Sequence, residues 1–181
     1  MGEVVFISNI FLTGKIKVGK STILNKVLNK LKIIPSGFKT LPFKEKQEIK
    51  GYYIKSNLDD SNTSNELHII AKKNKNNNWN IQHSTFDVIG VEILKNSLKA
   101  ENNVILMDEL GFFESKSLKF QDYVFKCLDS EKIVLGVIKP IRTSFLNKIR
   151  NRQDTIILHI NINNRDKQFE KVEDILNNIL Y

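Results

Sequence analysis

The segment at residues 14–21 constrains the fold of this 181-residue chain more than any other part of its sequence. It reads Gly-Lys-Ile-Lys-Val-Gly-Lys-Ser and matches the pattern G-x-x-x-x-G-K-[ST], a loop that joins a strand to a helix. The apolar run at 6–13 precedes it, and the stretch at 20–33 follows it with Ile, Leu and Val at helical spacing. This order predicts a strand, a phosphate-binding loop and a helix, the first half of a βαβ unit. The alternative is an ordinary strand-to-helix turn with an exposed lysine.

The loop residues predict how a triphosphate would be bound. In such a loop, successive backbone N–H groups point at the phosphates, and the N-terminus of the helix adds its positive end. Lys20 would reach the β and γ phosphates, and the Ser21 hydroxyl would coordinate Mg²⁺. Lys17 stands where such loops often have glycine, so its backbone must do without glycine's freedom in φ. The expected nucleotide-binding residues of this segment are Gly14, Lys15, Ile16, Lys17, Val18, Gly19, Lys20, Ser21 and Thr22.

A second candidate is the apolar run at 104–107, which leads directly into Asp108 and Glu109. In proteins with a phosphate-binding loop, such a strand lies beside the strand of the loop, and its aspartate holds Mg²⁺ together with the loop serine. Glu109 would point to the opposite side of the strand end, where it can orient or deprotonate a water in line with the γ phosphate. A surface glutamate is the alternative. We expect Lys20 and Glu109 to be catalytic, and Ser21 and Asp108 to bind the metal.

The segment at 37–83 predicts a small antiparallel meander. Short stretches at 51–55 and 66–72 are separated by polar, turn-forming clusters at 59–65 and 74–80. The second of these clusters is expected to be an exposed turn.

Regular alternation of strands and helices resumes at Ser84, which together with Asp87 fits a capping box before a helix. Continuous apolar strands are typical of a mostly parallel sheet with helices on both faces. The sequence therefore predicts an α/β fold, with a mostly parallel central sheet flanked by helices and the small antiparallel meander, as one domain over residues 1–181. The expected strands are 104–107, 133–138 and 155–160, and the expected helices are 117–128, 144–150 and one near the C-terminus.

Composition limits the partners and the compartment. Lys and Arg total 28 against 20 Asp and Glu, a net charge of +8 that alone invites a nucleic-acid partner. The excess is nearly all lysine, interleaved with Asn and Ile, which indicates a chain-wide bias and does not favour nucleic acid. The single cysteine, Cys127, cannot close a disulfide within the chain, and residues 1–6 lack the basic region of a signal peptide. These two features favour the cytoplasm. No apolar run approaches the ~18 residues that cross a bilayer, so we expect no membrane partner. We also expect a monomer.

Several motifs follow one another in a fixed order. They are Ile-Phe-Leu-Thr-Gly at 10–14, Val-Gly-Lys-Ser-Thr at 18–22, Gly-Phe-Lys-Thr at 37–40, Gly-Tyr-Tyr-Ile at 51–54, Asp-Glu-Leu-Gly-Phe-Phe-Glu at 108–114 with Ser117 and Phe120, Ile-Arg-Asn-Arg-Gln-Asp at 149–154 and Asn-Arg-Asp at 164–166. In this order, over nearly the whole chain, they resemble the nucleoside-triphosphatase family that includes the human cancer-related nucleoside-triphosphatase and its thermophilic microbial relatives. The stretch at 108–114 is the most specific of them.

The resemblance implies a RecA-like P-loop fold with an additional strand between the two motif strands. It also implies Mg²⁺-dependent hydrolysis of ATP, GTP and other nucleoside triphosphates to diphosphate and phosphate. The chain departs from the family at residues 15–17, where the family usually has Pro or Gly, and in its meander, which is rich in Lys and Asn.

Arginine is scarce, so each arginine near a motif is a candidate for stabilising charge on the transferring phosphoryl group. Arg142 follows the strand at 133–138 and could face the nucleotide or lie in a solvated loop. Arg150 and Arg152 lie at a helix end, where bonds to the last carbonyls are the simpler explanation. The three histidines have no metal-ligand spacing, so a zinc site is not expected; they are His68, His83 and His159.

Arg165 follows the last strand, where P-loop proteins often hold the base, and its guanidinium could stack on that base. The alternative for this segment is capping of the final helix by Asn164 or Asp166. Arg165 completes the expected nucleotide-binding set. Cys127 is expected to be a core thiol. Trp79 is expected to be a local packing anchor, and the alternative is a base-stacking or partner contact.

Three functions follow from these motifs. The leading prediction is a nucleoside-triphosphatase in which Glu109 orients water while Lys20 and the loop amides neutralise charge. The second is a P-loop kinase with Glu109 or Glu114 near an acceptor, but no arginine-rich lid that would exclude water is evident. The third is a nucleotide-dependent nucleic-acid-binding module that uses the positive surface.

Overall fold

The computed structural model describes residues 7–59 and 68–180. Its strands are β1 (Asn9–Thr13), β2 (Ser36–Glu45), β3 (Glu48–Ser56), β4 (Ile69–Lys73), β5 (Trp79–Ile81), β6 (Val104–Leu110), β7 (Ile133–Ile138) and β8 (Thr155–His159). Its helices are α1 (Lys20–Lys30), α2 (His83–Thr85), the π-helix η2 (Phe86–Gly90), α3 (Val91–Lys99), the 3-10 helix η3 (Phe113–Lys116), α4 (Leu118–Leu128), α5 (Ser144–Arg150) and α6 (Arg165–Leu180).

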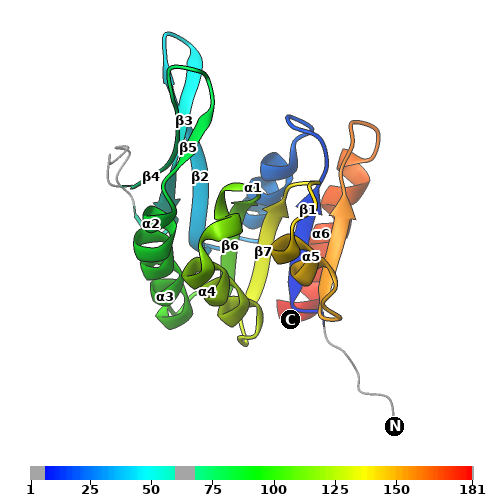
Figure 1. Cartoon of the computed structure of the whole chain (residues 1–181). Coiled ribbons are helices and arrows are strands. Elements are labelled where there is room, and N and C mark those ends of the chain that lie inside the picture. Colours follow the sequence, from blue (N-terminus) through cyan, green and yellow to red (C-terminus); the bar gives the residue numbers. More distant parts are fainter. Residues whose placement is uncertain (1–6, 60–67, 181) are drawn as a thin grey trace.

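One mixed sheet of eight strands forms the centre, in the order β5-β4-β3-β2-β6-β7-β1-β8 (Figure 1). The strands β2, β6, β7, β1 and β8 are joined by parallel pairings, and β3, β4 and β5 extend the sheet by antiparallel ones. The predicted α/β fold with a mostly parallel sheet and an antiparallel meander is confirmed. β7 lies between β1 and β6, so β6, which carries Asp108, is not directly beside the loop strand. The additional strand implied by the family resemblance is therefore present.

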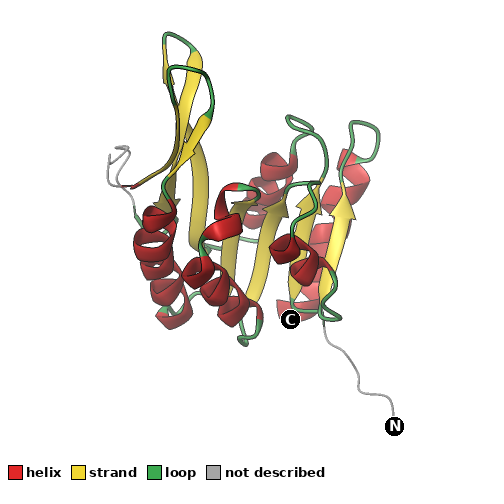
Figure 2. Cartoon of the chain, in the orientation of Figure 1, coloured by secondary structure: helices red, strands yellow, loops and turns green. Residues whose placement is uncertain are grey.

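Helices cover both faces of the sheet, as Figure 2 shows. On one face, α1 and α6 enclose a core that includes Ile10, Leu24 and Leu176. On the other face, α3, α4 and α5 pack over a second core that includes Phe11 and Phe120. The alternation of Ile10 and Phe11 between the two cores is the two-residue period of a strand buried on both sides. Because helices cover both faces of the sheet, only the ends of its strands are left for loops that can form a site.

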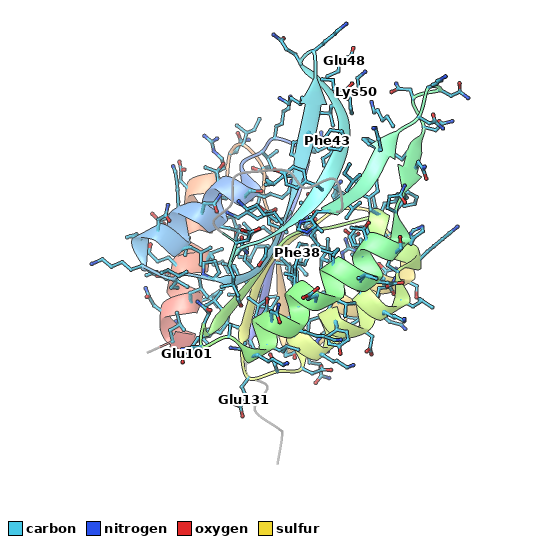
Figure 3. The ribbon with its side chains drawn as sticks, turned by 90° about the vertical axis from the view of Figure 1, so that its left-hand side faces the viewer. Phe38, Phe43, Glu48, Lys50, Glu101 and Glu131 are labelled. Atoms are coloured by element: carbon cyan, nitrogen blue, oxygen red, sulfur yellow. The ribbon has the colours of Figure 1, made fainter. Side chains whose placement is uncertain are left out.

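The antiparallel strands project beyond the carboxyl ends of the parallel strands. In Figure 3, Glu48 and Lys50 lie at the far end of the β2–β3 hairpin, whereas Glu101 and Glu131 lie at the opposite end of the molecule. Phe38, near the start of β2, is fully buried between these ends. The hairpin therefore stands on the same side as the loop that follows β1, and its base can line a site there. No helix in the described part of the chain is long and apolar enough to span a membrane.

The predicted capping box is wrong. No side chain caps α2 at its N-cap residue, Gln82. The Asp87 carboxylate instead accepts a hydrogen bond from the backbone N–H of Phe120 at 3.0 Å, in the first turn of α4. Asp87 thus accepts from an N–H group that has no partner within its own helix, α4. A rule based on the spacing of residues 84–87 could not reveal this contact.

The Asn-rich cluster at 74–80 is partly a turn, as predicted. The Asn74 side chain accepts hydrogen bonds from the backbone N–H groups of Asn76 and Asn78, at 2.9 and 3.0 Å. Its last residues, however, belong to β5, because Trp79 and Asn80 pair with Lys73 and Lys72 of β4. The Trp79 ring also contacts the rings of Tyr52 and Phe113, with centroids 5.4 and 5.5 Å apart. Phe6, most of the predicted turn at 59–65 and the start of the stretch at 66–72 lie outside the described residues.

Candidate active site

The loop between β1 and α1 has a backbone that depends on unusual φ angles. Gly14 and Gly19 have φ values of 145° and 97°, and a Cβ on Gly14 would collide with the carbonyl oxygen of Ile160. Lys17 adopts a φ of 63° without being glycine. Lys17, which stands where such loops often have glycine, therefore adopts the left-handed backbone conformation. This conformation costs about 1 kcal/mol relative to the right-handed one. The Val18 side chain is buried in the core between the sheet, α1 and α6.

Lys20 is folded back over the loop. Its ammonium group donates hydrogen bonds to the carbonyl oxygens of Gly14 and Lys15, at 2.9 and 2.8 Å. Burial lowers the pKa of Lys20, while the negative charges of Glu109 and Asp108 oppose that shift. A buried cation beside this loop is suited to an anion such as a phosphate group.

Ser21 and Asp108 meet across the space between α1 and β6. The Ser21 hydroxyl donates a hydrogen bond to Asp108 Oδ1 at 3.1 Å. Burial raises the pKa of Asp108, and the hydrogen bond from Ser21 and the charges of Lys39 and Lys20 act in the opposite direction. Two residues 87 positions apart are thus brought together as the motif spacing predicts.

Glu109 faces the same site because β6 is irregular at this residue. Asp108 pairs with Val137 and Leu110 pairs with Ile138, so Glu109 is an extra residue in the register. Such a bulge turns a side chain away from the side that strict alternation would give it. The expectation that Glu109 points to the opposite side from Asp108 is therefore corrected, since both residues line one cavity.

That cavity, which we call the phosphate cavity, has a volume of about 510 Å³. Its walls come from the loop, the start of α1, the middle of β2 and the end of β6. It brings together most of the predicted site residues with several from β2, which the sequence did not identify. They are Ile16, Lys17, Gly19, Lys20, Ser21, Thr22, Asn25, Lys39, Thr40, Leu41, Pro42, Asp108 and Glu109.

A second cavity of about 400 Å³, the helix cavity, lies between α1 and α6. It shares Gly19 and Thr22 with the phosphate cavity, so the two spaces meet at the start of α1. Arg165 and Phe169 line it from α6, and the Arg165 side chain lies close to Gly19. Arg165 is therefore beside the loop, as its assignment to the nucleotide site requires, while Asn164 bonds within its own turn and to the His159 carbonyl.

The oxygen atoms of Ser21 and Asp108 fit Mg²⁺. This ion usually takes one or two protein ligands and completes its shell with water and phosphate oxygens. Among residues 7–59 and 68–180, no group of three or more His, Cys, Asp and Glu could hold a metal ion. The Ser21–Asp108 pair therefore fits an ion whose remaining ligands come from water and from the phosphates of a nucleotide. His83 contacts the Ser117 hydroxyl at 3.1 Å.

Lys139, directly after β7, is a site residue that the sequence analysis missed. Its ammonium group forms an ion pair with Glu109 Oε1 at 2.9 Å. The only signal in the sequence is a lysine at the carboxyl end of the strand between the two motif strands. Glu114 lies close by, fully enclosed at 2% exposure, and burial raises its pKa to about 7.

The remaining arginines do not line the phosphate cavity, and Arg150 and Arg152 have structural partners elsewhere. Arg150 donates to the carbonyl of Lys139 at 2.5 Å and to Asn147, which corrects the expectation that it bonds the last carbonyls of its own helix. Arg152 pairs with Asp154 and Asp129 and also donates to the last carbonyl of α4. Arg142 is exposed and does not line either cavity.

Cys127 is a core thiol, as expected: it is fully buried, and burial raises its pKa to about 12. Trp79 is a packing anchor between β3 and η3, as its ring contacts show.

Known proteins resemble this chain in sequence and in fold. A family model described as NTPase matches residues 9–173. The nucleoside-triphosphatase THEP1 of Thermotoga maritima is 31% identical over 172 residues, which cover 92% of this chain and 94% of the relative. The nucleoside-triphosphatase THEP1 of Methanocaldococcus jannaschii is 32% identical over 174 residues, which cover 94% of this chain and 96% of the relative.

Two solved structures share the fold. The crystal structure of THEP1 from Aquifex aeolicus matches with a TM-score of 0.71 and 23% identity, over 93% of this chain and 98% of that one. The solution structure of a human cancer-related nucleoside triphosphatase matches with a TM-score of 0.71 and 21% identity, over 93% of this chain and 96% of that one. Both similarities extend over nearly the whole chain, so the P-loop fold includes the antiparallel strands.

Proposed function

Because this chain belongs to the NTPase family, whose model covers residues 9–173, we propose that it hydrolyses nucleoside triphosphates to diphosphates and phosphate with Mg²⁺. The observation that carries the proposal is the convergence of Lys20, the Ser21–Asp108 pair and Glu109 on one cavity. Phosphoryl transfer needs this set: a phosphate cradle, a metal-binding pair and a group that orients the nucleophile.

Each residue then has one task. Lys20 leaves the carbonyls of Gly14 and Lys15 and neutralises charge on the β and γ phosphates, together with the loop amides. Ser21 and Asp108 would hold Mg²⁺, which would offset negative charge on the phosphates. Glu109 accepts a hydrogen bond from the water whose oxygen attacks the γ phosphorus as the bond to the β-phosphate oxygen breaks.

The nucleoside is proposed to occupy the helix cavity. Thr22 belongs to both cavities, so a nucleotide whose phosphates lie in the loop can continue into the space between α1 and α6. Arg165 lines that space beside the aromatic ring of Phe169 and offers a planar cation to a base. The rest of the nucleotide-binding set is Gly14, Lys15, Ile16, Lys17, Val18, Gly19, Lys20, Ser21 and Thr22.

The test is phosphate release from ATP, GTP, CTP and UTP with Mg²⁺, by parental protein and by two variants. Lys20→Ala should lose nucleotide binding, and Glu109→Gln should bind nucleotide yet release phosphate about 100-fold more slowly or worse. Lys126→Ala, which removes an exposed lysine on α4, is the matched control and should keep the parental rate. A parental rate in Glu109→Gln would remove Glu109 from the reaction.

The same assay separates the alternatives. Adding a panel of phosphoryl acceptors would suppress free phosphate and raise turnover if the protein is a kinase. Salt-sensitive binding of RNA or DNA would favour the nucleic-acid-binding module. We propose instead a monomeric cytoplasmic enzyme. Residues 1–181 are proposed to act as one domain, because a single sheet contains both β2 and β6, which line the phosphate cavity.

A further inference from the structure

The ion pair between Lys139 and Glu109 differs from the surface pairs of this protein. Both of its side chains are 28% exposed. In the pair between Lys126 and Asp122, the side chains are 51% and 62% exposed. Since solvent screens a pair less as it becomes more enclosed, the contact between Lys139 and Glu109 can restrict the position of a carboxylate in a way that a surface pair does not.

Lys139 is fixed at its backbone before its side chain reaches Glu109. Its N–H donates to the carbonyl of Leu110 at 2.9 Å, which continues the pairing of β6 and β7 past the bulge. Its carbonyl accepts a hydrogen bond from Arg150 at 2.5 Å. The position of the Cα of Lys139 is therefore tied to the residue next to Glu109 and to α5.

The aliphatic part of Lys139 lies against the turn after β6. A Cβ on Gly111 would come within 2.9 Å of Lys139 Cδ, so the absence of a side chain there makes room for the lysine. The ammonium group lies 5.5 Å from the ring centroid of Phe113. These contacts direct the ammonium group toward Glu109 and restrict the side-chain torsion angles of Lys139.

Glu114 holds that turn from the inside. Its Oε2 accepts a hydrogen bond from the N–H of Gly111 at 2.8 Å, and its side chain is enclosed. Glu109, Gly111, Phe113, Glu114 and Lys139 line one small cavity with Thr40 and Tyr52. The two carboxylates and the ammonium group thus share one pocket, which meets the phosphate cavity at Thr40 and Glu109.

We propose that Lys139 is a positioning residue for Glu109: it holds Oε1 of the carboxylate so that Oε2 faces the phosphate cavity, and Glu114 fixes the turn on which Lys139 rests. This inference rests on the proposed function, because it assigns a task within the hydrolysis reaction. A glutamate that could rotate freely would spend little time in the orientation that binds the attacking water. Misplacing a reacting group by about 1 Å costs on the order of 100-fold in rate.

The experiment measures kcat and KM for ATP with Mg²⁺ in Lys139→Met, Lys139→Arg and the control Lys126→Met. Lys139→Met should lower kcat about 10- to 100-fold with KM changed less than about threefold, as removal of an orienting partner does. Lys139→Arg should recover most of kcat, because a guanidinium also donates to a carboxylate. Lys126→Met should behave as the parental protein, and thermal unfolding should show that each variant folds.

A double-mutant cycle separates positioning from direct contact with the phosphates. If Lys139 acts through Glu109, then adding Lys139→Met to Glu109→Gln should change the residual rate less than about twofold. A further large loss in that background would overturn the inference, since it would mean that Lys139 acts on the substrate itself. An unchanged kcat in Lys139→Met would also overturn it.

The outcomes distinguish this inference from the proposed function. No phosphate release by the parental protein would refute the proposed function. Normal release by the parental protein, its loss in Glu109→Gln and a parental rate in Lys139→Met would refute the positioning role alone.

Discussion

Glu114 contributes stability that should depend on pH. Burial raises the pKa of its carboxyl group from 4.5 to about 7, against the hydrogen bond from Gly111 and the charge of Lys139. The folded protein therefore binds one more proton than the unfolded chain between these two pKa values. The free energy of unfolding should fall as pH rises through this range, by about 1.4 kcal/mol for each pH unit, or about 3 kcal/mol in all.

Replacing Glu114 by glutamine should remove this pH dependence. Glutamine has nearly the same size, its carbonyl oxygen can accept the Gly111 N–H, and it does not titrate. The buried charge that burdens the parental protein above pH 7 is then absent. The variant should gain stability relative to the parental protein as pH rises.

The measurement is urea unfolding, followed by circular dichroism, at pH 5, 6, 7 and 8 with EDTA and without nucleotide. The difference in free energy of unfolding between the parental protein and Glu114→Gln should change by about 2 to 3 kcal/mol between pH 5 and pH 8. Glu131→Gln, at an exposed residue at the far end of the sheet, is the matched control and should leave the pH dependence unchanged. Parallel curves for the parental protein and Glu114→Gln would refute the reasoning.

Three further outcomes test other parts of the molecule. Lys17→Gly should raise the free energy of unfolding by about 1 kcal/mol, because a φ of 63° suits glycine, and equal or lower stability in urea would contradict this. Cys127, fully buried with a pKa raised by burial to about 12, should react with a thiol reagent at pH 8 only after unfolding, so fast labelling of the folded protein would be inconsistent with its burial. EDTA should abolish phosphate release, and Ser21→Ala should raise the Mg²⁺ concentration for half-maximal rate at least about tenfold; an unchanged Mg²⁺ requirement would remove Ser21 from the metal site.

The parts of the site that depend on local spacing could be predicted from the sequence. The loop at 14–21 is contiguous, and an apolar strand that ends in Asp108 is a local pattern whose partner, Ser21, is defined by the same fold. The strand at 133–138 and the helix at 144–150 have the predicted bounds, because their apolar periods and flanking breaks agree.

The parts that depend on pairing between distant strands could not be predicted. Lys139 meets Glu109 because β6 and β7 pair in a register with one extra residue, and nothing near Lys139 in the sequence indicates that bulge. The error at Asp87 has the same origin, since its carboxylate serves the N-terminus of a helix 33 residues further along the chain.

The antiparallel strands are part of the site and not an appendage beside it. Thr40 and Pro42, at the middle of β2, line the phosphate cavity opposite the loop. On the neighbouring strand β3, Tyr52 packs on Phe113 with ring centroids 5.6 Å apart. The ammonium group of Lys139 lies 5.5 Å from the ring centroid of Phe113. A segment that looks like a polar meander in the sequence therefore supplies one wall of the phosphate cavity, and through Tyr52 it packs on the ring beside Lys139.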